Sequence, residues 1–203
     1  MLGFWNYTVY MTYFGLLSSV VGMALAMGGH SIGAVVCLLI SGGCDMFDGR
    51  IARTKKDRTD EEKAFGIQID SLCDVVCFGV LPAVLCYCVG ADRPWQIAVE
   101  ALFVLCGVVR LAYFNVTEEI RQSATSETRH TYSGLPITAS AFFVPLLMCF
   151  AGVLGESFDV FYSALLIVMG LMYIAPIRIR KPGAVGALVL LVLGAAILII
   201  VLL

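Results

Sequence analysis

The sequence of 203 residues is poor in charge, and the shortage is most marked at its start. Only 14% of the residues are charged, against about a quarter in an ordinary soluble domain, while 60% are hydrophobic and the mean hydropathy is +0.94. No Asp, Glu, Lys or Arg occurs among residues 1–44. These shortages exclude a soluble globular enzyme, a nucleic-acid-binding protein and a disordered tail, and they indicate a polytopic membrane protein.

Common metal-binding and secretion motifs are also missing. The eight cysteines form no Cys-x-x-Cys pair and no zinc spacing, so we interpret them as packing residues. No basic residue precedes the first apolar run, which argues against a cleavable signal peptide. The roughly ten-residue alternating segments of a membrane barrel are absent, so we expect an all-α fold.

Apolar runs long enough to cross a membrane recur along the chain. A transmembrane helix needs about 20 apolar residues, and the break at residues 28–30 divides the uncharged start into two runs. We predict a polytopic transmembrane helical bundle of about seven spans, with six to eight as the range. The predicted spans lie near residues 6–27, 31–48, 66–91, 95–115, 134–154, 157–176 and 183–203.

The positions of the basic residues predict the orientation of this bundle. With a cytoplasmic N-terminus, twelve of the thirteen Lys and Arg residues fall on the cytoplasmic side, and only Arg93 lies outside. We therefore predict an integral membrane protein whose N-terminus and polar segment face the cytoplasm.

Half of the charged residues gather in residues 45–74, which hold eight acidic and six basic side chains. Asp45 and Asp48 lie three residues apart at the inner end of the second span, and Asp70 and Asp74 lie four apart at the start of the third. Both spacings place the two carboxylates on one face of a helix. Four carboxylates this close would repel one another, so we expect one or two divalent cations, Mg²⁺ or Mn²⁺, between them.

Glycine and arginine residues flank these carboxylates. Gly49 and Gly66 would let a bulky ligand approach the backbone, and Arg53 offers a forked donor set that suits phosphate. With the metal ions, these residues indicate a phosphate-ester site, in which metal bridges a pyrophosphate. The alternative for the aspartates is salt-bridging to neighbouring arginines. We interpret the intervening residues 54–65 as a solvated connecting loop.

The pattern Asp-x2-Asp-Gly-x2-Ala-Arg, followed by Gly-x3-Asp-x3-Asp, resembles the signature of the CDP-alcohol phosphotransferase family. The signature is met at eight positions: Asp45, Asp48, Gly49, Ala52, Arg53, Gly66, Asp70 and Asp74. Twelve residues separate Arg53 from Gly66, a longer connection than is common in the family. Residues 65–83, 110–116 and 134–136 resemble membrane-embedded bacterial and archaeal phosphatidylserine synthases, although Tyr113 stands where these usually carry a basic residue.

The resemblance implies a CDP-diacylglycerol–serine O-phosphatidyltransferase of phospholipid biosynthesis in a bacterial or archaeal cell membrane. Residues 1–182 would form the family's transmembrane domain and 183–203 an additional helix, in a chain that forms a homodimer. Asp74 would be the general base that activates L-serine, and CMP would be released. Two divalent cations, Mg²⁺ or Mn²⁺, would be coordinated by Asp45, Asp48, Asp70 and Asp74. CDP-diacylglycerol would be bound by Gly49, Ala52, Arg53 and Gly66.

A serine acceptor requires a cation for its carboxylate and an acceptor for its ammonium group. Arg110 is our first candidate for the carboxylate, and the alternative is an interface arginine that snorkels to the surface. Further candidates for the serine pocket are Ser71, Asn115, Arg178 and Arg180, of which the two arginines are alternatively assigned to anionic membrane lipids. Glycerol 3-phosphate or inositol is the alternative acceptor, and a divalent-cation transporter is the rival function because carboxylates also line ion paths.

Overall fold

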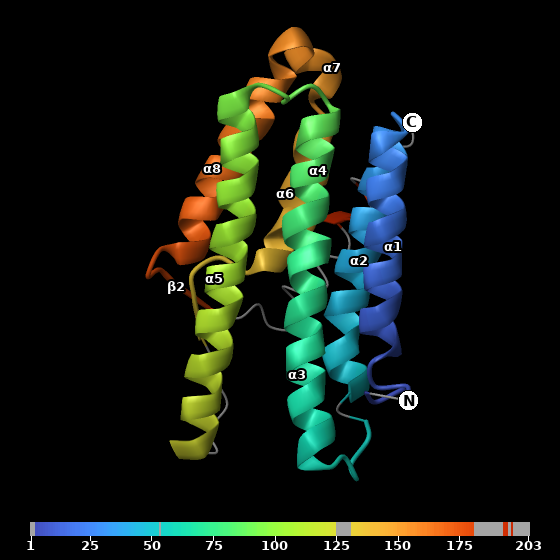
Figure 1. Ribbon diagram of the computed structural model, residues 1–203, viewed down its shortest axis with the longest axis vertical. Coiled ribbons are helices and arrows are strands. Elements are labelled where there is room, and N and C mark those ends of the chain that lie inside the picture. Colours follow the sequence, from blue (N-terminus) through green and yellow to red (C-terminus); the bar gives the residue numbers. More distant parts are fainter. Residues whose placement is uncertain (1–2, 53, 125–130, 181–192, 195, 197–203) are drawn as a thin grey trace.

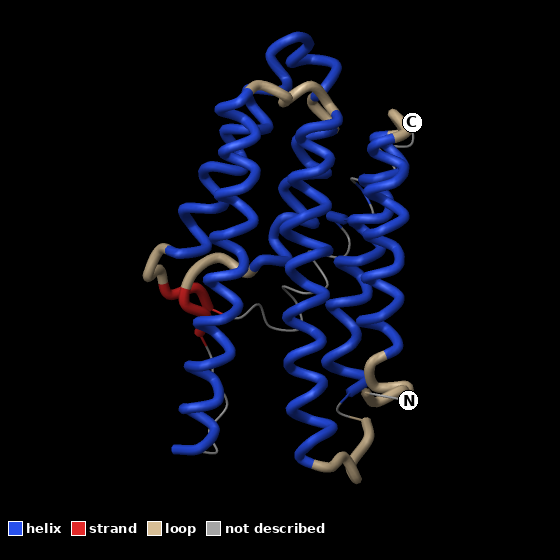
Figure 2. Tube along the Cα trace, in the orientation of Figure 1, coloured by secondary structure: helices blue, strands red, loops and turns tan. Residues whose placement is uncertain are grey.

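The computed structural model describes residues 3–52, 54–124, 131–180, 193–194 and 196, with the backbone alone at 122–124, 131–133 and 178–180. This part of the chain is nearly all helical, and one short pair of strands accompanies the helices (Figure 2). The first half contains α1 (Tyr10–Met27), α2 (Ser31–Ala52), α3 (Asp60–Asp74), the π-helical segment η1 (Val75–Val80) and α4 (Leu81–Cys88). The second half contains α5 (Pro94–Ala124), β1 (Thr131–Ser133), η2 (Ile137–Ala139), α6 (Ser140–Met148), α7 (Ala151–Leu154), η3 (Gly155–Ser157), α8 (Phe158–Ile174) and β2 (Arg178–Arg180).

Long apolar helices dominate the bundle, and they run roughly along its longest axis (Figure 1). Five segments of the described chain have the length and composition to cross a membrane: Tyr10–Met27, Ser31–Ala52, Asp60–Cys88, Pro94–Arg121 and Ala151–Ile174. A shorter apolar helix covers Ile137–Met148. The structure therefore indicates an integral membrane protein, as its composition predicts.

The predicted number of seven spans is wrong for the described residues, which support five to six. The predicted span at 134–154 is interrupted, because η2 and α6 form only twelve helical residues that end at Met148, and α7 begins after Phe150 as the start of the next apolar segment. Twelve residues rise about 18 Å, well short of a hydrocarbon core about 30 Å thick. The predicted last span, 183–203, lies almost entirely outside the described residues.

The connection between α2 and α3 is shorter than the predicted solvated loop at 54–65, because α3 already begins at Asp60. Thr59 and Glu62 form a reciprocal capping box, in which each side chain accepts a hydrogen bond from the other residue's backbone N–H. Glu62 also pairs with Lys55 at 2.8 Å, and this hydrogen bond raises the pKa of the Lys55 ammonium group. Acidic residues favour the first turn of a helix, so the charge that suggested a loop instead starts α3.

Small residues let α1 and α2 pack closely. The Ser41 hydroxyl donates to the Gly15 carbonyl at 2.8 Å and hydrogen-bonds with the Ser19 hydroxyl at 2.8 Å. A Cβ atom on Gly22 would lie only 2.8 Å from the Cys37 Cβ. Close approach through small and hydroxylated residues is typical of helix pairs in membranes, and here it fixes the position of α2 and its aspartates.

The segment before α6 is anchored to the end of α8. β1 pairs antiparallel with β2, so a short sheet supplements the predicted all-α fold. Gly134 has a φ of +79°, and a Cβ atom there would lie 2.5 Å from the Tyr173 carbonyl oxygen. Gly134 N–H donates to the Ile177 carbonyl at 2.8 Å, and Leu135 N–H to the Met172 carbonyl at 2.9 Å. These contacts set the position of Pro136 and η2.

Candidate functional site

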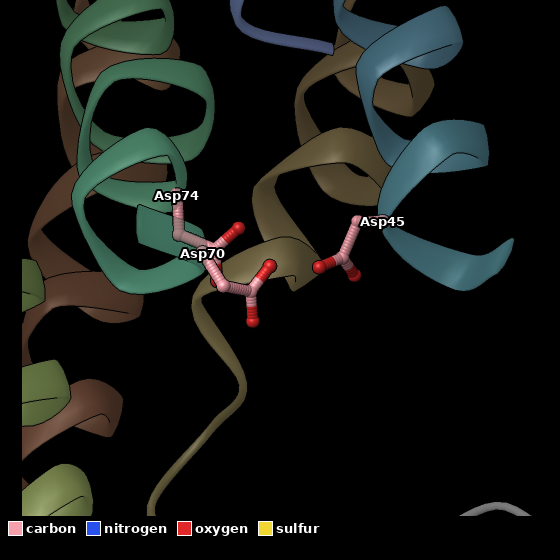
Figure 3. A group of neighbouring side chains, drawn as sticks. All are labelled: Asp45, Asp70 and Asp74. Carbon is pink, nitrogen blue, oxygen red and sulfur yellow. The ribbon is translucent and has the colours of Figure 1, made fainter. Parts of the chain in front are cut away.

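Three carboxylates from two helices face one another near the middle of the bundle. Asp45 extends from α2, and Asp70 and Asp74 extend from α3 towards it (Figure 3). One carboxylate oxygen of each residue lies within 4.8 Å of the others. Asp70 Oδ1 is buried and has no hydrogen-bond partner among the described residues. Because oxygen donors of this kind suit hard divalent cations, the three residues fit a metal site.

Asp48 lies beside this group but on its α1 side. It is buried, and its Oδ2 accepts a hydrogen bond from the Thr12 hydroxyl of α1 at 3.2 Å. Its carboxyl group also lies next to that of Asp70. Sequence reasoning did not identify Thr12, because a threonine in an uncharged apolar helix carries no signal until α1 is packed against α2.

A π-helical segment follows Asp74 directly. The helix from Asp60 to Cys88 is continuous, and its six residues Val75–Val80 have the wider π-helical turn. The Ser140 hydroxyl donates to the Phe78 carbonyl in this segment at 2.9 Å. A π-helical turn shifts the faces that precede and follow it, and such turns are frequent at functional sites. Here the turn separates the aspartate-bearing face of α3 from the apolar packing face of α4.

A cavity of about 600 Å³ opens beside the carboxylates. It is bounded by α3, by α5 and by the segment from Pro136 to Thr138, and its volume is typical of a small-molecule site. The predicted site residues that line it are Asp45, Asp70, Ser71, Asp74, Arg110 and Asn115. The fold therefore brings residues of three helices to one cavity.

The first candidates for the serine pocket lie together in this cavity. Arg110 is 8% exposed and lies within electrostatic reach of Asp74, so a snorkelling arginine at the membrane surface does not describe it. The Asn115 amide donates to the Ser71 hydroxyl at 2.9 Å across α5 and α3. Arg178 and Arg180 belong to β2 by their backbone, and their side chains lie outside what the structure describes.

Three of the four candidates for the CDP-lipid lie on α2 and α3. Gly49 is exposed on α2, Ala52 is the last residue of α2, and Gly66 is half-buried one turn before Asp70. Arg53 lies outside the described residues. The space beside Gly66 is taken by a residue that the sequence did not indicate, because Arg58 Nη2 lies 2.7 Å from the position of a Gly66 Cβ atom.

Further cavity residues were missed by sequence reasoning. Glu118 and Glu119 line the cavity from α5, and Thr138 lines it from η2. A signal for Glu118 was present, because Arg110, Phe114 and Glu118 recur at every fourth position and so share one helical face. Thr138 carried no comparable signal, since its position depends on the anchoring of Gly134 to α8.

Comparisons with known proteins identify a family and several relatives of this chain. A family model described as CDP-alcohol phosphatidyltransferase matches residues 5–201. A CDP-diacylglycerol–serine O-phosphatidyltransferase of Helicobacter pylori is 33% identical over 139 residues, which cover 66% of this chain and 54% of that protein. The protein of the same name from Saccharomyces cerevisiae is 34% identical over 111 residues, 53% of this chain and 38% of that protein.

An archaeal relative carries a different name. The archaetidylserine synthase of Methanothermobacter thermautotrophicus is 37% identical over 125 residues, which cover 61% of this chain and 49% of that protein. The chain thus spans about half the length of the curated relatives it matches.

Proposed function

The chain belongs to the CDP-alcohol phosphatidyltransferase family, and we propose that it transfers the phosphatidyl group of CDP-diacylglycerol to the hydroxyl of L-serine and releases CMP. The observation that carries this proposal is the meeting of Asp45, Asp70 and Asp74 at a cavity that also contains Arg110. Serine as the acceptor is supported by relatives at about a third identity that are named serine O-phosphatidyltransferases.

Divalent cations are the cofactors of the proposed reaction. Asp45, Asp70 and Asp74 would hold them, with Asp48 as an adjacent fourth carboxylate. We propose two ions, Mg²⁺ or Mn²⁺, because carboxylate oxygens suit hard cations. When bound, the ions supply neutralisation of the diphosphate charge and stabilisation of the departing CMP, worth several kcal/mol.

Asp74 is the proposed general base. It lines the cavity within reach of Arg110, where an acceptor alcohol can approach. The serine hydroxyl oxygen forms a bond to the lipid-proximal phosphorus, and the bond from that phosphorus to the CMP oxygen breaks. The hydroxyl proton passes to the Asp74 carboxylate, so no covalent enzyme intermediate is required. General-base catalysis of this kind contributes about 10²–10⁴ in rate.

The charges of the cavity suit a zwitterionic acceptor. Arg110 would bind the carboxylate of serine through its forked donors, and the hydrogen-bonded Ser71 and Asn115 would contribute polar lining. Glu119 would attract the ammonium group, whereas Glu118 is paired with Arg121 at 2.6 Å. The Glu119 carboxylate would disfavour glycerol 3-phosphate, since a second anion close to it is repelled.

The proposed reaction takes place at the cytoplasmic side of a bacterial or archaeal cell membrane. Support for this orientation comes from the basic residues, twelve of which lie inside when the N-terminus is cytoplasmic. The lipid substrate would reach the site from the bilayer and serine from the cytosol. A homodimer is proposed from the family resemblance.

The acceptor assay tests this proposal. Purified protein in detergent or liposomes is given CDP-diacylglycerol with Mg²⁺ or Mn²⁺, and CMP release is measured with L-serine, glycerol 3-phosphate or inositol. We expect release that requires both CDP-diacylglycerol and serine. Release that only glycerol 3-phosphate or inositol stimulates would refute the serine assignment and keep the reaction class. Metal uptake by proteoliposomes without a lipid substrate would instead favour a transporter.

A further inference from the structure

Arg58, in the connection between α2 and α3, folds back over the proposed CDP-lipid site. Its Nη1 donates to the Ala52 carbonyl at 3.5 Å, and its Nη2 donates to the Glu62 carbonyl at 3.2 Å. The position of a Cβ atom on Gly66 lies 2.7 Å from the same Nη2. The guanidinium group therefore occupies the space that the missing side chain of Gly66 leaves open, next to the end of α2.

Among the described residues, no acidic side chain forms an ion pair with Arg58. Glu62 is paired with Lys55 at 2.8 Å, and Asp60 is paired with Lys63 at 2.9 Å. Arg58 Nε is buried and has no hydrogen-bond partner among the described residues. Two neutral carbonyl oxygens leave most of the five guanidinium donors unused. Because Arg58 is only half-buried, the N–H groups of Nη1 and Nη2 that these two carbonyls leave unused are available to an anionic ligand.

The position of Arg58 relates it to the carboxylate cluster. Gly66 lies four residues before Asp70, so the two share one face of α3 and are separated by about 6 Å along its axis. A nucleotide whose diphosphate lies at the cluster and which extends towards Gly66 passes within reach of Arg58. Arg58 also lies outside the eight signature positions, in the connection that is longer here than is common in the family.

We propose that Arg58 binds a phosphate group of the cytidine nucleotide portion of the CDP-lipid. The inference rests on the proposed function, because that function places the nucleotide beside Ala52 and Gly66. The planar guanidinium fork matches phosphate oxygens in geometry and charge. Arg58 is therefore a substrate-binding residue supplied by the longer connection, in addition to the motif residues.

Nucleotide binding by the full-length protein in detergent tests the inference. CMP affinity is measured by calorimetry with Mn²⁺ present and no acceptor alcohol, for the wild type, Arg58→Gln and Lys56→Gln. Glutamine at position 58 keeps an amide donor for the Glu62 carbonyl but removes the charge. Lys56 is exposed in the same connection, so its variant removes an equal charge from a neighbouring position.

We expect Arg58→Gln to weaken CMP binding about tenfold, the scale of a lost charge-assisted contact, and Lys56→Gln to change it little. The KM for CDP-diacylglycerol should rise by a similar factor, and the KM for serine should stay unchanged. Equal CMP affinity in the two variants would overturn the inference. Tighter binding by Arg58→Gln would also overturn it, because the guanidinium group would then obstruct the nucleotide.

Two further results keep the test decisive. If Arg58→Gln does not fold, Arg58→Lys retains the charge without the fork and should still weaken CMP binding several-fold; unchanged affinity would contradict the inference. If the wild type itself does not bind CMP, the proposed function fails together with this inference. Binding by the wild type with no effect at position 58 refutes the inference alone.

Discussion

Two groups of polar side chains lie beside α5, one at its start and one beside its middle, and their carboxylates have different neighbours. In the first group, Asp45, Asp70 and Asp74 face one another beside a cavity. In the second, Asp159 of α8 accepts a hydrogen bond from the Gln96 amide at 3.1 Å and pairs with Arg93 at 3.6 Å. Gln96 and Arg110, the α5 members of the two groups, are separated by fourteen residues, or roughly 21 Å along the helix.

The two groups differ in the hydrogen-bond donors that the protein itself provides for their carboxylates. Gln96 is fully buried, and its amide also donates a hydrogen bond to the Ser163 hydroxyl at 3.2 Å. The second group therefore joins α5 to α8 through hydrogen bonds whose donors belong to the protein. The first group consists of three carboxylates, whose oxygens can only accept hydrogen bonds when ionised. Such a group suits a divalent cation that is bound from solution. We therefore interpret the first group as catalytic and the second as structural.

Removal of divalent cations should separate the two groups most strongly. Chelation with EDTA should reduce CMP release to background, because the proposed chemistry depends on ions at the carboxylate cluster. Helix content by circular dichroism should stay unchanged, since the Gln96 group contains protein donors. Added Mn²⁺ or Mg²⁺ should restore release. Activity that survives exhaustive chelation would contradict metal dependence.

Neutralising one carboxylate in each group is the next largest test. Asp74→Asn should lower the turnover number by about 10²–10⁴, the range expected for loss of a general base. Asp159→Asn keeps a side chain of the same size and should leave turnover per folded molecule close to that of the wild type. Both are measured by serine-dependent CMP release. Retained turnover in Asp74→Asn would remove Asp74 from the base role.

Gln96→Leu should act on stability alone. The change leaves the Asp159 carboxylate and the Ser163 hydroxyl without their buried amide partner, which should cost about 1–3 kcal/mol of unfolding free energy. Unfolding in detergent with increasing denaturant measures this loss. CMP release per folded molecule should be unchanged. A large fall in turnover with no loss of stability would connect this group to catalysis.

Thr12→Val should have the smallest effect. The variant removes the hydrogen bond to Asp48 Oδ2 while keeping the shape of the side chain. A net loss of about 1 kcal/mol corresponds to roughly fivefold weaker Mn²⁺ binding, which titration of free Mn²⁺ by electron paramagnetic resonance measures. Thr12→Ser retains the hydroxyl and should restore affinity. Equal affinity in all three proteins would show that Thr12 does not position Asp48 for the metal.

Features of the site that depend on local spacing were predictable. Asp70 and Asp74 share a face of α3 because residues four apart on a helix lie one above the other, and the same reasoning places Arg110 with Glu118 on α5. Contacts between helices were not predictable in this way. The hydrogen bond from Thr12 to Asp48 forms only when α1 packs against α2. Arg58 reaches Gly66 only when the connection between α2 and α3 folds back.

The errors in the predicted fold have the same origin. Apolar composition at 134–154 predicted a membrane span, but composition does not report the extended segment at Pro136 or the break at Cys149 and Phe150, which limit the helix. Charge at 54–65 predicted a solvated loop, although the same residues form a capping box at the start of α3. Breaks and caps depend on single residues and their partners, and average composition does not resolve them.

The sequence by itself determined that this protein is a membrane-embedded helical bundle with its carboxylates in two spaced pairs, because hydropathy and helical periodicity are properties of the chain alone. Only the tertiary structure decided which carboxylates meet. Asp45 joins Asp70 and Asp74 because α1 and α2 pack through small residues and α3 lies against them, while Asp48 lies next to Asp70 and accepts a hydrogen bond from Thr12. Distances between side chains on different helices depend on how the helices pack, and they cannot be derived from the spacing of residues within one helix.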